Sequence, residues 1–145
     1  MSGPVGTDAD PRLLLFHKQG TSARTRFLRF GDSLLAFAPL PAGAVLRAED
    51  AAPGKIIPLA PTLLKVAEDK LGLPGGSLQL DPEFSATLDT PRGELPVLLA
   101  GFTTLDPPFA AAESLGARFV ALTEVRGLPA AELELVRRAY TAILG

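Results

Sequence analysis

The sequence contains neither cysteine nor tryptophan, and its 145 residues include one histidine. Without cysteine the chain cannot form disulfides, thiolate metal sites or a cysteine nucleophile, and we expect a cytoplasmic protein. A Ser-His-Asp triad would have to use His17, with Ser22 or Ser33 as its serine. Because no Gly-x-Ser-x-Gly motif presents a serine, we expect His17 to be a surface residue at the end of a strand.

Long hydrophobic runs and a strong net charge are also absent. Although 47% of the residues are hydrophobic, no apolar stretch approaches the ~20 residues of a membrane-spanning helix. Residues 1–11 lack the pattern of a signal peptide, so we expect a flexible arm there and a single domain over residues 12–145. The net charge of −2 gives no general attraction to nucleic acid. The composition therefore predicts neither a membrane nor a nucleic acid partner.

One short region departs from this charge balance. Between residues 18 and 30, four basic residues are interleaved with two phenylalanines: Lys18, Arg24, Arg26 and Arg29, with Phe27 and Phe30. The pattern is typical of an amphipathic hairpin with a charged outer face. Contact with RNA or a nucleotide is the alternative interpretation.

Glycine and proline, with 14 residues of each, divide the chain into short elements. We expect a first strand at Leu13–Phe16. A hairpin should follow, with strands Thr25–Phe30 and Ser33–Ala38 joined at Gly31-Asp32, because glycine tolerates the positive φ of a tight turn.

A second hairpin is predicted later in the chain. Apolar and polar residues alternate from Phe84 to Asp89, and the apolar segment Leu95–Phe102 follows after a turn. Pro96 has no backbone N–H, so it indicates an edge position or a late start to the pairing of its strand. Shorter strands are expected near Lys55–Ile57 and at Ala117–Leu122.

Three helices complete the predicted elements. Pro61–Leu71 should end at Gly72, a short helix capped by Asp106 should end at Gly116, and Pro129–Leu144 should close the chain. The last helix has a predicted core stripe of Leu133, Val136, Tyr140, Ile143 and Leu144. Its water-facing side is predicted to contain Glu132, Glu134, Arg137, Arg138 and Thr141. Strands interspersed with helices predict an α/β fold with a mixed sheet, two main helices and one short helix.

The end of the first helix resembles the Nudix signature, whose last part runs Arg-Glu-aliphatic-x-Glu-Glu-x-Gly-aliphatic. Lys65–Leu73 retains the frame, with a basic residue first, the small apolar Ala67 and the terminal Gly72-Leu73. The element order from Arg26 to the C-terminus is also similar to that of the family. The resemblance implies a Nudix-like α/β/α sandwich.

The chemistry of the signature is mostly missing. The family hydrolyses nucleoside diphosphate derivatives with Mg²⁺ or Mn²⁺, which the glutamates of the signature hold. Val66, Asp69 and Lys70 occupy those positions here. Val66 offers no ligand and Lys70 adds a cation where the metal charge would be. Because Glu68 and Asp69 are adjacent, they point about 100° apart around the helix and cannot share one ion. The resemblance therefore implies a degenerate site with no metal and no cofactor.

Weaker candidate residues remain. Glu124 follows the Ala117–Leu122 strand, where some family members place a catalytic carboxylate, so Asp69 and Glu124 are the weak catalytic candidates. Arg92 at a hairpin tip, together with Arg118 and Arg126 on either side of Glu124, could bind an anion through the planar guanidinium group. Solvation or structural pairing is the alternative for all three arginines.

We therefore expect a non-catalytic Nudix-like domain that binds a small ligand or a protein partner. A divergent Mg²⁺-dependent pyrophosphohydrolase that uses Asp69 and Glu124 is the first alternative. A structural or self-associating protein, for example a homodimer with Phe109 at its interface, is the second.

Overall fold

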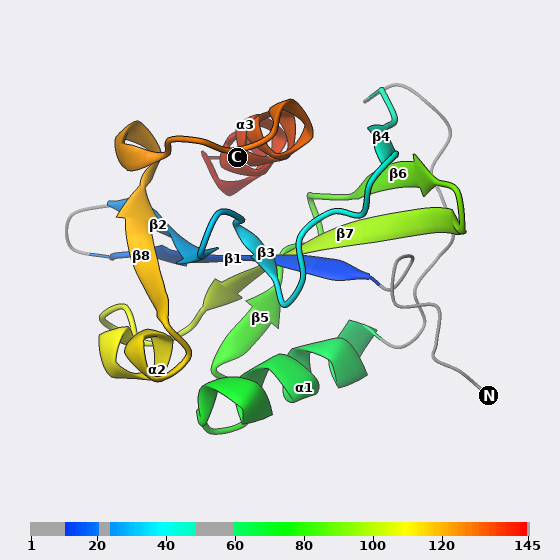
Figure 1. Ribbon diagram of the computed structural model, residues 1–145. Coiled ribbons are helices and arrows are strands. Elements are labelled where there is room, and N and C mark those ends of the chain that lie inside the picture. Colours follow the sequence, from blue (N-terminus) through cyan, green and yellow to red (C-terminus); the bar gives the residue numbers. More distant parts are fainter. Residues whose placement is uncertain (1–10, 21–23, 49–59, 145) are drawn as a thin grey trace.

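The computed structural model describes residues 11–20, 24–48 and 60–144 as a sheet between two layers of helices (Figure 1). The helices are α1 (Ala60–Leu71), α2 (Phe109–Ser114) and α3 (Ala130–Leu144), with a 3-10 turn η2 (Leu122–Glu124). The strands are β1 (Arg12–Lys18), β2 (Thr25–Phe30), β3 (Leu35–Ala36), β4 (Val45–Leu46), β5 (Leu78–Leu80), β6 (Ala86–Thr90), β7 (Gly93–Phe102) and β8 (Ala117–Ala121). The expected residues 1–10 of the N-terminal arm and the strand near Lys55–Ile57 lie outside the described residues.

The sheet is mixed, as the sequence predicted. Its strand order is β4-β6-β7-β1-β2-β8, with β3 also paired to β1 and β5 also paired to β7. The central strands β1 and β7 run parallel, and the other described pairings are antiparallel. Figure 1 shows α1 and α2 on one face of this sheet and α3 on the other. The predicted α/β class with two main helices and one short helix is confirmed.

Each face of the sheet has its own apolar core, because successive residues of a strand point to opposite faces. On β1, Leu14 packs with Leu135 and Val136 of α3. Leu13 and Leu15 instead join the core formed with α1 and α2. The sheet therefore separates the molecule into an α3 side and an α1 side.

The hairpin predicted from the alternating segment is present. β6 and β7 pair antiparallel from Ala86↔Val97 to Thr90↔Gly93. Pro96 pairs with β6 only, and the pairing of β7 with β1 starts one residue later, at Val97. Among the described residues, Pro96 thus has a paired strand on one side only. This position tolerates proline, which has no backbone N–H to donate to a second strand.

The hairpin predicted at Gly31-Asp32 was wrong in its pairing. A turn does form, with two backbone hydrogen bonds between Phe30 and Ser33 at 2.7 and 3.0 Å. Beyond it the chain leaves β2, and β3 pairs with β1 through Leu13↔Ala36 and Leu14↔Leu35. The end of β2 pairs instead with β8. β1 thus pairs with β2 along one part of its length and with β3 along another. The local alternation of apolar and polar residues does not predict this change of partner.

The buried face of α3 is rotated from the predicted one. The helix buries Glu132, Leu135, Val136 and Ala139, while Leu133 is 49% and Leu144 is 60% exposed. Glu132 was expected in water but is 1% exposed, because its carboxyl group accepts hydrogen bonds from Ser33 Oγ and Leu34 N at 2.9 Å each. These bonds fix the rotation of the helix against the sheet.

The ends of α1 and α2 differ in how well they were predicted. Gly72 ends α1 with a φ of 70°, and the Leu73 amide donates to Glu68 O at 2.9 Å, as in a Schellman motif. The expected N-cap Asp106 of α2 is wrong, since α2 begins after Pro108 without a side-chain cap. Asp106 instead accepts a hydrogen bond from Gln19 at 2.9 Å.

No helix among the described residues is long and apolar enough to span a membrane.

Glu134 of α3 forms ion pairs with Arg137 and Arg138, and these pairs give a pH-dependent prediction. Arg137 and Arg138 donate to Glu134 at 2.6–3.0 Å and lower the pKa of Glu134 to about 2. A carboxyl group with a lowered pKa stabilises the fold above its ordinary pKa and loses this contribution as the pH falls toward 2. Glu134→Gln should therefore lower the melting temperature near neutral pH, with a difference from the wild type that vanishes toward pH 2.

Circular dichroism melts over a pH series would measure this difference. Glu113→Gln, at an exposed position on α2, is the matched control and should show no such trend. A difference for Glu134→Gln that is independent of pH would contradict the prediction.

Candidate functional site

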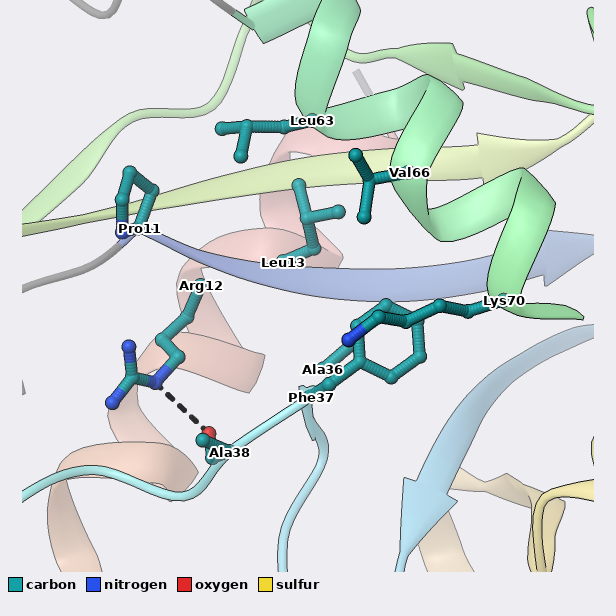
Figure 2. Close-up of a pocket in the computed structure, with 9 residues that line it drawn as sticks. All are labelled: Pro11, Arg12, Leu13, Ala36, Phe37, Ala38, Leu63, Val66 and Lys70. Atoms are coloured by element: carbon teal, nitrogen blue, oxygen red, sulfur yellow. Dashed lines mark hydrogen bonds between the residues drawn. The ribbon is translucent and has the colours of Figure 1, made fainter. Parts of the chain in front are cut away.

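A cavity of about 490 Å³ lies on the α1 side of the sheet, between α1, the start of β1 and the segment after β3 (Figure 2). We call it the α1 pocket. Its lining residues are Pro11, Arg12, Leu13, Ala36, Phe37, Ala38, Leu63, Val66 and Lys70. Most of these side chains are apolar, and the charged ones are both cations.

One face of α1 forms the wall of the pocket. Leu63, Val66 and Lys70 are spaced by three and four residues, so they lie on one side of the helix. Figure 2 shows all three on the side of α1 that faces β1. Val66 and Lys70, which the predicted resemblance aligns with glutamates, therefore contribute an apolar group and a cation to this pocket.

Lys70 is the exposed cation of the pocket. Its Nζ lies 4.7 Å from the centre of the Phe37 ring, a cation–π contact, and Figure 2 shows the Lys70 side chain crossing over this ring. The ring attracts the ammonium group without neutralising its charge. Lys70 thus adds an exposed positive charge to the lining of a largely apolar cavity.

Arg12 has a different role from Lys70. It is 4% exposed, and its Nε donates to the carbonyl oxygen of Ala38 at 3.0 Å. The guanidinium also donates to Pro39 O. Arg12 therefore ties the segment after β3 to β1 and shapes the wall of the pocket, while adding positive charge to its surroundings.

The structure does not bring the weak catalytic candidates together. The side chain of Asp69 is 67% exposed and lies 4.0 Å from Lys65, away from the α1 pocket. Glu124 accepts a hydrogen bond from the Ala121 amide at 2.7 Å and so caps η2. Figure 1 shows α1 and the turn after β8 on opposite sides of the sheet. Within the described ranges, no three His, Asp or Glu side chains are grouped as metal ligands.

Glu68, beside Asp69, is buried, which the sequence analysis did not predict. It is 5% exposed, and its Oε2 accepts hydrogen bonds from the amides of Gly76 and Leu78 at 3.0 and 2.9 Å. The one signal in the sequence is position, since Glu68 precedes the buried Leu71 by three residues and shares its face of the helix. The carboxylate of α1 that is shielded from water thus anchors the loop before β5.

The candidate arginines are dispersed, and none of them lines the α1 pocket. Arg92 is exposed at the tip of the β6–β7 hairpin. Arg126 donates to the carbonyl oxygens of Thr123 and Val125 at 2.8 and 3.1 Å. Arg118 is exposed on β8, the last strand of the described sheet. The predicted anion site between Arg118 and Arg126 around Glu124 stays a prediction.

His17 is not a surface residue, contrary to expectation. It is fully buried, and its Nε2 donates to Thr104 O at 2.7 Å. Its Nδ1 has no hydrogen-bond partner within the described residues. Ser33 donates to Glu132, so this serine and His17 do not form a triad, and Ser22 lies outside the described residues. The carbonyl at residue 104 fixes the orientation of the ring.

The basic residues between 18 and 30 do not form a single outer face. Arg29 is 7% exposed and donates to Gly31 O at 2.8 Å. Arg26 lies over the ring of Phe109, 6.0 Å from its centre. Phe109 is 50% exposed, as the interface hypothesis requires, although this exposure alone names no partner.

Comparison with known proteins does not add to this picture. No protein-family model matches the chain, and no curated protein matches it significantly. The geometry of the α1 pocket is therefore the principal guide to function.

Proposed function

We propose that this chain is a non-catalytic, Nudix-like domain that binds a small organic anion in the α1 pocket. The observation that carries the proposal is a cavity of about 490 Å³ that is lined mainly by apolar side chains, with the exposed Lys70 and no carboxylate among its described lining residues. Small-molecule sites in proteins typically measure about 300–1,000 Å³ and combine apolar walls with a few polar groups. The Nudix-like part of the proposal rests on the retained frame of Lys65–Leu73 within a mixed α/β fold.

The chemistry of the lining selects the class of ligand. Leu13, Leu63 and Val66 present hydrocarbon surface, which favours an apolar body. Lys70 favours a carboxylate or phosphate group at the open end and opposes a divalent cation. An amphipathic anion satisfies both parts of the pocket, whereas a metal-bound diphosphate would meet a positive charge where the signature would supply glutamates.

A series of arylcarboxylates, each with its uncharged aryl alcohol, tests the proposal. The carboxylates should shift the amide resonances of Val66 and Phe37, and they should bind more tightly than the alcohols. Lys70→Ala should weaken carboxylate binding by about tenfold, the effect of losing one charge-assisted hydrogen bond. Lys65→Ala on the same helix is the matched control, because its side chain is 73% exposed and lies outside the pocket lining.

Two results would overturn the proposal. Equal binding of carboxylate and alcohol, with no effect of Lys70→Ala, would remove the anion-binding role. Robust hydrolysis of nucleoside diphosphate derivatives with Mg²⁺ or Mn²⁺, lost in Asp69→Ala or Glu124→Ala, would show that the domain is an enzyme after all.

A further inference from the structure

Two arginines lie directly opposite each other on neighbouring strands at the edge of the sheet. The register of β2 and β8 pairs Arg29 with Arg118. Directly opposed residues of an antiparallel pair point to the same face, with their Cβ atoms about 4.5–5.5 Å apart. Phe27 and Val120, which also pair in this register, belong to the core on the α3 side. Arg29 and Arg118 therefore share the α3 side of the sheet.

The buried member of the pair is held in place. Arg29 is 7% exposed, and its Nε donates to Gly31 O at 2.8 Å. The chain before α3 passes beside the guanidinium, since a β-carbon placed at Gly127 would lie 3.8 Å from Nη2 of Arg29. The backbone thus fixes the inner edge of the guanidinium, and no hydrogen bond to the described residues occupies its Nη groups.

No acidic side chain in the described part of the chain neutralises this pair. Among the described residues, no carboxylate lies within 4.0 Å of either arginine, the distance of an ion pair. Of the acids near these elements, Glu124 binds its own turn and Glu132 binds Ser33 and Leu34. Asp32, in the turn after β2, is exposed and makes no ion pair with Arg29. Two like charges directly across a strand pair destabilise the sheet unless something compensates them.

We propose that Arg29 and Arg118 form a binding site for a phosphate dianion, either free or as a phosphomonoester. A guanidinium offers parallel N–H donors that match two oxygens of one phosphate group. Arg29 supplies an oriented, desolvated fork, and Arg118 supplies a second cation from the solvent side. A dianion between them converts the repulsion into two attractive contacts. The site lies on the opposite side of the sheet from the α1 pocket and is independent of the function proposed there.

Titration of the full chain with inorganic phosphate tests the site, with chloride at equal ionic strength as the reference. The amides of Gly31, Arg118 and Gly127 should shift together, and the melting temperature should rise. Arg118→Gln should weaken phosphate binding by at least about tenfold. Arg92→Gln, at an exposed arginine on the distant β6–β7 hairpin tip, is the matched control and should bind as the wild type does.

Arg118→Glu provides a second, independent measurement. It places a carboxylate opposite Arg29, so it should raise the melting temperature in phosphate-free buffer and abolish the further rise on adding phosphate. A parallel series with methyl phosphate separates the two sources of the ligand: tighter binding than inorganic phosphate indicates an ester, and weaker binding indicates the free anion. Unchanged phosphate binding in Arg118→Gln, or equal losses in Arg118→Gln and Arg92→Gln, would overturn the proposal.

Discussion

Replacing Glu132 with alanine is expected to lower the free energy of unfolding by about 2–4 kcal/mol. The side chain is 1% exposed, and each of its oxygens accepts one hydrogen bond at 2.9 Å, from Ser33 Oγ and from Leu34 N. Leu34 is fully buried and Ser33 is 5% exposed, so water cannot easily replace the lost acceptor. Alanine would leave two buried donors without partners and a cavity beside α3.

The location of these bonds adds to their expected effect. They join α3 to the turn at which the chain leaves β2 and enters β3. Ser33 Oγ also accepts a hydrogen bond from Leu35 N at 3.1 Å, so the loss extends to the first residue of β3. The carboxyl group of Glu132 therefore joins α3 to the turn before β3, two segments that lie far apart in the sequence.

Urea unfolding followed by circular dichroism measures the loss. Glu132→Gln keeps an amide oxygen that can accept from Leu34 N, so it should be less destabilising than Glu132→Ala. Glu134→Ala is the matched control on the same helix, because Glu134 pairs with Arg137 and Arg138 at the surface. If Glu132→Ala proved no more destabilising than Glu134→Ala, the anchoring role would be refuted.

The sequence predicted those parts of the fold that depend on local backbone chemistry. Gly72 ends α1 because its φ of 70° suits glycine, and Leu73 then closes the terminal hydrogen bond. The β6–β7 hairpin follows from alternation of apolar and polar residues, and Pro96 marks where pairing with β1 begins. In each case the determining residues lie within a few positions of the feature.

Buried polar residues were the main source of error, because their burial depends on distant partners. Glu132 and Ser33 are separated by 99 positions, and His17 and Thr104 by 87. A glutamate or histidine next to polar residues in the sequence is predicted to be exposed, because its buried hydrogen-bond partner cannot be identified from the neighbouring residues. The exchange of β2 for β3 beside β1 has a similar origin, since β3 pairs with Leu13 and Leu14 of β1, which lie far from it in the sequence.

The candidate site was only partly predictable, because some of its residues are local to one helix and others come from distant parts of the chain. The helical spacing along α1 places Leu63, Val66 and Lys70 on one side of the helix, and the structure shows all three in the lining of the α1 pocket. This spacing could not show that Arg12 on β1 and Phe37 in the segment after β3 would complete a pocket around them. The face of α1 that lines the cavity was therefore predictable from local spacing, whereas the cavity itself depends on residues from distant parts of the chain.

Glu68 and Asp69 allow a direct test of whether the carboxylates of α1 serve the fold or a metal. Glu68→Ala is expected to lower the free energy of unfolding by about 2–3 kcal/mol, because the amides of Gly76 and Leu78 would lose their shared acceptor. Asp69→Ala should change it by no more than about 0.5 kcal/mol, since its side chain is 67% exposed.

Glu68→Gln distinguishes the hydrogen-bond acceptor of this side chain from its negative charge, because glutamine keeps the first and lacks the second. Both amides donate to a single oxygen, Oε2, and the amide oxygen of glutamine can take the same position. The glutamine variant should therefore keep most of the stability that the alanine variant loses, whether or not Mg²⁺ is added. A metal ligand would behave differently, because removing its charge would abolish any stabilisation by Mg²⁺. Stabilisation of the wild type by Mg²⁺ that disappears in Glu68→Gln would thus contradict the structural role and restore the enzyme hypothesis for this helix.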